Sequence, residues 1–167
     1  MNVLIWGSTE TSPELRHEVP LAIGDPFLYL EANGRRAVIT NALEDLKLAQ
    51  ALPELERLLV DDLGRDELVA TGRSRFEIEQ EVCLRAARAL GIGDATVPLD
   101  FPLALGDGLR AAGLSLTPDE DLFTERRRHK TDAEMAGIRR AANAAVEAVH
   151  DARAVLRAAE IRGGELW

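Results

Sequence analysis

The stretch 125–159 constrains the fold more than any other part of the sequence, because it predicts one long helix with a defined start. Thr131 and Glu134 have the spacing of a capping box, in which each side chain accepts a hydrogen bond from the backbone N–H of the other residue. Asp132 adds negative charge to the first turn, where the helix dipole favours it. We therefore expect a helix to begin directly after Thr131.

Apolar residues then recur at steps of three and four, which is the spacing of a helix face that packs against a neighbour. Gly137 weakens this helix, and we expect Gly163-Gly164 to end it. The predicted face, called the helix seam, consists of Met135, Ile138, Ala142, Ala145, Val149, Ala152, Leu156 and Ala159. Because most of these residues are alanine, the seam predicts a close neighbour. The sequence reaches Trp167 soon afterwards, so we expect that neighbour to lie in sequence absent from this chain.

The composition is that of a folded domain with no general affinity for polyanions. With 167 residues, of which 46% are hydrophobic, the chain can form one domain, or one domain and part of another, around a real core. Its net charge of −9 disfavours nucleic acid and anionic membranes as partners. The sequence shows no signal peptide and no apolar run that could span a bilayer, so we expect a soluble, cytoplasmic protein.

The first three quarters of the sequence predict strands that begin as a hairpin and later alternate with helices. Asn33-Gly34 between two β-rich runs is a strong hairpin signal, whereas 66–72 fits either a helix or a loop. Strands are expected at 3–6, 27–31, 36–40, 58–60, 94–98 and 114–116, and helices at 43–51, 75–90 and 103–112. This order predicts an α/β fold with a mixed β-sheet flanked by helices, followed by one long C-terminal helix.

The basic run 126–130 stands out in an acidic chain. It directly precedes the long helix, at a shift from mixed sequence to alanine-rich sequence. We interpret 124–131 as a basic hinge between an N-terminal α/β domain, 1–123, and the helical segment 132–167, rather than as a nucleic-acid site. The residues assigned to this interdomain hinge are Arg126, Arg128, Lys130, Thr131 and Glu134.

The residues alone show no catalytic constellation. His17, His129 and His150 are the only histidines, and none of them has the spacing of a metal ligand. The acidic clusters lie beside turn-forming residues, so capping and solvation explain them. Cys83 is the only cysteine and is expected to be buried. We therefore predict no catalytic, cofactor-binding or metal-binding residue in this chain.

The run 125–142 resembles the junction between the two domains of the creatinase, prolidase and Xaa-Pro aminopeptidase family. Members carry an arginine, a lysine, a capped glutamate and then Ile-Arg-x-Ala, matched here by Arg126 or Arg128, Lys130, Glu134 and 138–141. The stretches 25–31 and 105–109 are also similar to the family's N-terminal domain. The resemblance extends over nearly the whole chain.

This resemblance implies an N-terminal domain followed by the first helix, 132–167, of a truncated pita-bread catalytic domain. In such enzymes the catalytic domain binds two divalent metal ions, usually Mn, Co or Zn, which activate a water that attacks the peptide bond before proline. The family's metal ligands lie beyond this helix, so the chain alone is expected to bind no metal and to be inactive. The implied role of the N-terminal domain is to pair subunits as a homodimer and to limit access to short peptides with proline at the second position.

Two other classes of function remain open. A stand-alone α/β interaction module could dimerise through the helix seam, which supports this interpretation equally well. A small enzyme that uses His17 with nearby carboxylates is disfavoured, because no second group stands at a defined spacing.

Overall fold

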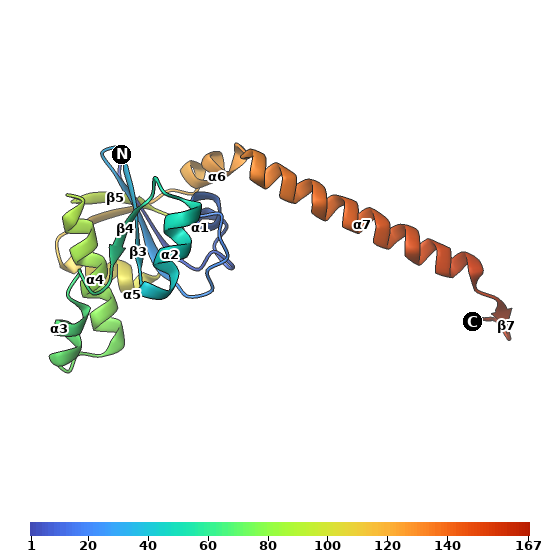
Figure 1. Ribbon diagram of the computed structural model, residues 1–167, viewed down its shortest axis with the longest axis horizontal. Helices are drawn as coiled ribbons and strands as arrows, with labels where there is room; N and C mark the ends of the chain where they lie inside the picture. Colours follow the sequence, from blue (N-terminus) through green and yellow to red (C-terminus); the bar gives the residue numbers. More distant parts are fainter. The chain divides into compact units, whose positions relative to one another are not determined.

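A computed structural model describes the backbone of residues 1–167 and the side chains of all of these except Leu166. The strands of the main sheet are β1 (Val3–Gly7), β2 (Phe27–Ala32), β3 (Arg35–Thr40), β4 (Glu56–Leu59), β5 (Asp94–Val97) and β6 (Ser115–Pro118). They form one six-stranded sheet in the order β4-β3-β2-β1-β5-β6 (Figure 1). β2 runs antiparallel to both of its neighbours, and the other pairings are parallel. The predicted mixed sheet is confirmed.

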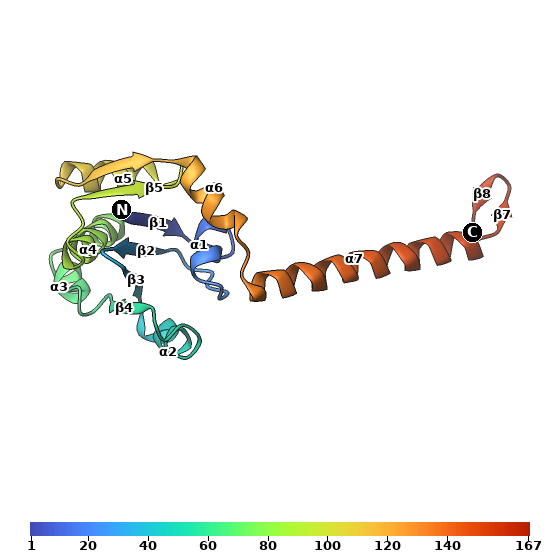
Figure 2. The ribbon, with the colours of Figure 1, turned by 90° about the horizontal axis from the view of Figure 1, so that it is seen from above.

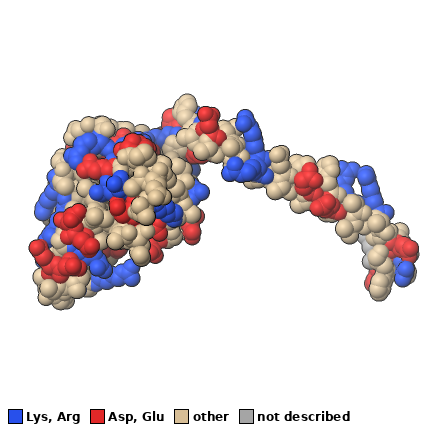
Figure 3. Space-filling view, viewed as in Figure 1, with Lys and Arg blue, Asp and Glu red and all other residues tan. Residues whose placement is uncertain are grey.

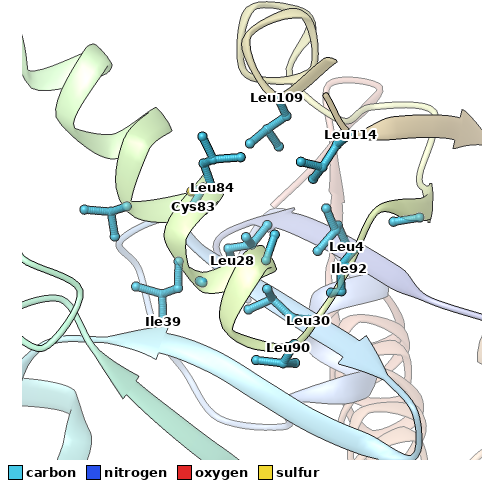
Figure 4. Close-up of a cluster of buried hydrophobic side chains, with 14 of the residues drawn as sticks. Leu4, Leu28, Leu30, Ile39, Cys83, Leu84, Leu90, Ile92, Leu109 and Leu114 are labelled. Carbon is cyan, nitrogen blue, oxygen red and sulfur yellow. The ribbon is translucent and has the colours of Figure 1, made fainter. Parts of the chain in front are cut away.

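Helices cover both faces of this sheet (Figure 2). They are α1 (Pro13–Glu18), α2 (Ala42–Ala51), α3 (Arg65–Ala70), α4 (Arg75–Ala89), α5 (Leu103–Ala111) and α6 (Glu120–Arg128). Successive residues of a strand point to opposite faces, so the strands supply two separate cores. Leu4, Leu28 and Leu30 pack under α4 and α5 (Figure 4). Val3 and Tyr29, one residue out of phase, pack under α1, α2 and α6.

Local sequence explains where the elements begin and turn. Asn33 and Gly34 adopt φ angles of 54° and 77°, the left-handed conformation that a two-residue hairpin requires. The Asn41 side chain accepts from the backbone N–H groups of Leu43 and Glu44 and so caps α2. Ser74 opens α4 with a complete capping box. The predicted hairpin turn is confirmed.

Helix α6 was not predicted, because 124–128 was assigned to the hinge. The segment begins as a helix after Asp119, whose carboxylate accepts from the N–H of Leu122 at 3.0 Å. Phe123 is only 3% exposed and attaches the helix to the core. The remaining differences are small: the segment 66–72 contains α3, and two strands are displaced by one or two residues, to Glu56–Leu59 and Ser115–Pro118.

Contacts divide the chain into two compact units, Met1–Arg127 and Arg128–Trp167. The second unit contains α7 (Asp132–Ala158) and a short antiparallel pair, β7 (Ile161–Arg162) and β8 (Glu165–Leu166). The predicted helix start is confirmed, since Thr131 and Glu134 form the capping box. The predicted end was wrong. Ala159 is already extended at φ −67° and ψ 142°, and Gly163-Gly164 forms the turn between β7 and β8 instead of ending the helix.

Within the described part of the chain, no helix is both long enough and apolar enough to cross a bilayer.

Candidate functional site

The end of α6 is held to the sheet by a cluster of charged side chains in the first unit. The Arg126 guanidinium donates a hydrogen bond to the carboxylate of Glu31, in β2. Its Nε also lies 3.4 Å from Oε1 of Glu18, the last residue of α1. The Glu18 side chain is only 10% exposed and that of Arg126 24%, so both are shielded from much of the solvent. Arg126 thus joins α6 to two neighbouring elements, α1 and β2, that lie far from it in sequence.

Tyr29 and Arg36 complete this ionic cluster, which we define as Glu18, Tyr29, Glu31, Arg36 and Arg126. The Tyr29 hydroxyl lies 3.2 Å from Glu18 Oε2 and 3.1 Å from Glu31 Oε2, and its single proton can serve one carboxylate at a time. Arg36 Nε donates to the same hydroxyl at 3.1 Å. Arg36 Nη2 also lies 3.6 Å from Glu18 Oε2. Two arginines therefore balance two glutamates around one phenol.

Burial and charge fix the protonation states of this cluster. Burial, followed by the negative charge of Glu18, raises the pKa of Tyr29 well above its ordinary range, against the opposing effect of Arg36. For Arg126, burial disfavours the charge, but the Glu31 hydrogen bond and the charges of Glu18 and Glu31 outweigh it and raise the pKa. For Arg36, burial again disfavours the charge, but the hydrogen bond to Tyr29 and the charge of Glu18 help to outweigh it and raise the pKa. The phenol thus stays neutral while both guanidinium groups stay charged.

Tyr29 is the only tyrosine, so the ultraviolet absorbance of phenolate reports on this cluster alone. We expect no phenolate signal in the folded protein at pH values near the ordinary tyrosine pKa of about 10. In denaturant the same residue should titrate at that ordinary value. Because the folded-state pKa is raised, the cluster's contribution to stability is present below the unfolded-state pKa and is lost as the pH rises above it. A folded-state titration curve identical to the denatured one would contradict this geometry.

The residues assigned to the hinge have different local settings. Arg126 and Arg128 lie in α6, whereas Lys130 lies between α6 and α7. Thr131 and Glu134 form the capping box of α7, with Thr131 N donating to Glu134 Oε2 at 2.8 Å. Arg127, which lies within 124–131 but was not among the residues singled out there, pairs with Glu14 at 3.1 Å.

Sequence reasoning missed the sheet side of the ionic cluster. The available signal was the hairpin register, which places Glu31 directly opposite Arg36. Tyr29 and Glu31 are two residues apart and therefore share a face of β2. What the sequence could not indicate is that Arg126, far along the chain, reaches this same face.

The helix seam remains exposed in the second unit. None of the residues of α7 is buried, and Ile138, Val149 and Leu156 are 48%, 57% and 59% exposed. Val146 and Val155, which the seam did not include, are also exposed apolar residues. On the face of the first unit that Figure 3 shows, by contrast, acidic and basic side chains are interspersed.

The structure brings together no candidate metal site among the residues it describes. No group of three or more His, Cys, Asp or Glu side chains there has a metal-binding arrangement. Cys83 is buried, and burial, followed by the charge of Glu79, raises the pKa of its thiol, which makes it a poor nucleophile.

No protein-family model and no curated protein matches the sequence. Among solved structures, the chain is similar to an Xaa-Pro dipeptidase from Bacillus anthracis, with a TM-score of 0.56 and 18% identity over 81% of this chain and 33% of that one. It is also similar to an Xaa-Pro aminopeptidase from Streptococcus pyogenes, with a TM-score of 0.51 and 12% identity over 75% of this chain and 82% of that one.

The chain has the creatinase/prolidase family fold. At these identities the similarity is one of fold. The mixed sheet with helices on both faces and the long helix at the carboxyl end are the features expected of the creatinase-like N-terminal domain and the helix that follows it. The chain spans about a third of the length of the Bacillus anthracis protein.

Proposed function

We propose that this chain is the non-catalytic N-terminal domain, with the first helix of a catalytic domain, of an Xaa-Pro-peptidase-like protein. The observation that carries this proposal is the similarity to an Xaa-Pro dipeptidase over most of this chain but only a third of the other. The parent reaction would be metal-dependent hydrolysis of peptides with proline at the second position. Two divalent ions, Mn, Co or Zn, would be held by parts of the parent protein outside this chain.

The ionic cluster supports a positioning role in such a protein. Arg126 and Arg127 tie the end of α6 to glutamates of α1 and β2. The chain therefore leaves the first unit from a fixed point, immediately before the capping box of α7. A defined exit point is what a domain needs if it is to limit access to an active site on the following domain.

The activity test uses the 167-residue chain with Mn²⁺, Co²⁺ or Zn²⁺ and short peptides with proline at the second position. We expect no hydrolysis above the metal-only background. Cleavage that depends on the chain would contradict the non-catalytic assignment. The same peptides with alanine in place of proline serve as the specificity control.

A homodimer is the proposed association state, and the first unit is the proposed pairing surface. The competing proposal, favoured by the exposed apolar side chains of α7, is a stand-alone module that dimerises through the helix seam. Sedimentation of a Val149→Glu, Leu156→Glu variant distinguishes the two, since charges on an apolar interface oppose association. If the dimer forms through the first unit, the variant should remain a dimer. If it forms through the helix seam, the variant should be a monomer. Asn143→Glu, which adds one negative charge to α7 outside the helix seam, is the control.

A further inference from the structure

A hollow of about 420 Å³ lies at the carboxyl ends of β1, β3 and β4, against the first half of α4. Open α/β sheets bind small ligands outside the carboxyl ends of their strands. The volume falls within the roughly 300–1,000 Å³ typical of small-molecule sites. The hollow belongs entirely to the first unit and uses none of the ionic cluster.

Its walls are mainly apolar and include two aromatic rings. Trp6 and Phe27 come from β1 and β2, Ile39 from β3, and Ile78 and Val82 from α4. Phe27, Ile39 and Val82 are buried and belong to the two cores, so this part of the wall is fixed. Figure 4 shows Ile39 on the sheet and Cys83 on the facing side of α4. Such a surface suits an apolar or aromatic ligand body.

Two cations line the same hollow. Arg65 and Arg75 are the first residues of α3 and α4, and both side chains are exposed. Among the side chains that the structure describes, neither makes an ion pair with a carboxylate; Arg85, in contrast, pairs with Glu81 at 3.2 Å. The one acidic lining residue is Glu79. The lining therefore carries a net positive charge, although the net charge of the chain is −9. The positive charge is a local property of the hollow and does not follow from the overall charge of the chain.

The single carboxylate limits the kind of anion that fits. Burial raises the pKa of Glu79, and the nearby Arg75 opposes that shift. Any anion in the hollow lies near this carboxylate as well as the two arginines, and the repulsion from the carboxylate is larger for a dianion such as a phosphate than for a monoanion. Asn41 contributes little acceptor capacity, because its side-chain oxygen already accepts from Leu43 and Glu44.

We propose that the hollow binds a small carboxylic acid with an apolar body, its body against Trp6, Phe27, Ile39, Ile78 and Val82 and its carboxylate toward Arg65 and Arg75. This site goes beyond the proposed function and does not depend on it. Binding at the hollow can occur whether or not the chain belongs to a peptidase.

The test compares octanoate with octanol and octylamine, which share the apolar chain but differ in charge. Trp6 is one of two tryptophans, so a Trp167→Phe background makes its fluorescence the only indole signal. We expect saturable changes with octanoate, affinity for octanol lower by roughly tenfold because the charge-assisted hydrogen bonds are lost, and the weakest binding for octylamine. Equal affinities for all three, or no saturation by octanoate below its micelle concentration, would overturn the proposal.

Variants locate the site. Arg65→Ala with Arg75→Ala should lower the octanoate affinity roughly tenfold or more and abolish its advantage over octanol. Both arginines are exposed, so the fold is expected to survive, which thermal unfolding checks. Arg88→Ala removes one positive charge elsewhere on α4 and should leave the affinity unchanged. The assignment is wrong if the double variant binds octanoate as tightly as the Arg88 control does. It is also wrong if octanoate changes the sedimentation coefficient, because a second copy of the chain would then cover the hollow.

Discussion

Replacing Arg126 with alanine is expected to lower the free energy of unfolding of the first unit by about 2 kcal/mol. Removal of one partner from a buried ion pair costs roughly 3–5 kcal/mol, and partial exposure of this cluster reduces that cost. The loss leaves Glu18 and Glu31 beside Tyr29 with Arg36 as the remaining cation of the ionic cluster. Urea denaturation followed by circular dichroism measures the effect.

The matched control is Arg35→Ala, which breaks an ion pair on the same sheet. Arg35 lies 2.7 Å from Glu56, but the two side chains are 49% and 38% exposed. Exposed pairs contribute roughly 1 kcal/mol or less. If Arg126→Ala costs no more than Arg35→Ala, the cluster does not hold α6. A double-mutant cycle with Glu31→Gln should show a coupling of about 1 kcal/mol, since the two side chains are in contact.

The largest loss of stability is expected for Leu4→Ala, at about 3 kcal/mol. Leu4 is fully buried in β1, opposite Leu30 of β2, and packs under α4 (Figure 4). Removal of a buried leucine side chain costs roughly 2–5 kcal/mol through lost burial and the cavity left behind. Chemical denaturation of the purified variant provides the measurement.

Leu43→Ala is the control for this change, because Leu43 is 89% exposed in α2. It should alter the free energy of unfolding by less than about 0.5 kcal/mol. Similar losses for the two leucines would mean that the sheet face under α4 is not the main core.

Local signals in the sequence predicted most of the fold. The hairpin followed from Asn33-Gly34, and the start of α7 followed from Thr131 and Glu134, because turns and caps depend on residues close together in the chain. Helix α6 could not be predicted in this way. Its charged residues suggested a solvated segment, and the glutamates that pair with them lie about a hundred positions away.

The end of α7 shows a second limit. Gly163-Gly164 was interpreted as a helix stop, but these glycines serve a hairpin in which Glu160 and Trp167 exchange two backbone hydrogen bonds. A glycine pair predicts a turn, but it does not indicate whether that turn ends a helix or joins two strands. The hollow beside α4 was also invisible in the sequence, because its lining residues come from strands and helices that meet only in the folded sheet.

Both faces of β2 are buried, which restricts the insertions and deletions that this strand can accept. Phe27 and Tyr29 belong to one core and Leu28 and Leu30 to the other. Loss of a single codon within this strand would exchange the two sets, bringing a phenol and a carboxylate under α4 and leucines beneath α6. Insertions and deletions within 27–32 should therefore be eliminated by selection.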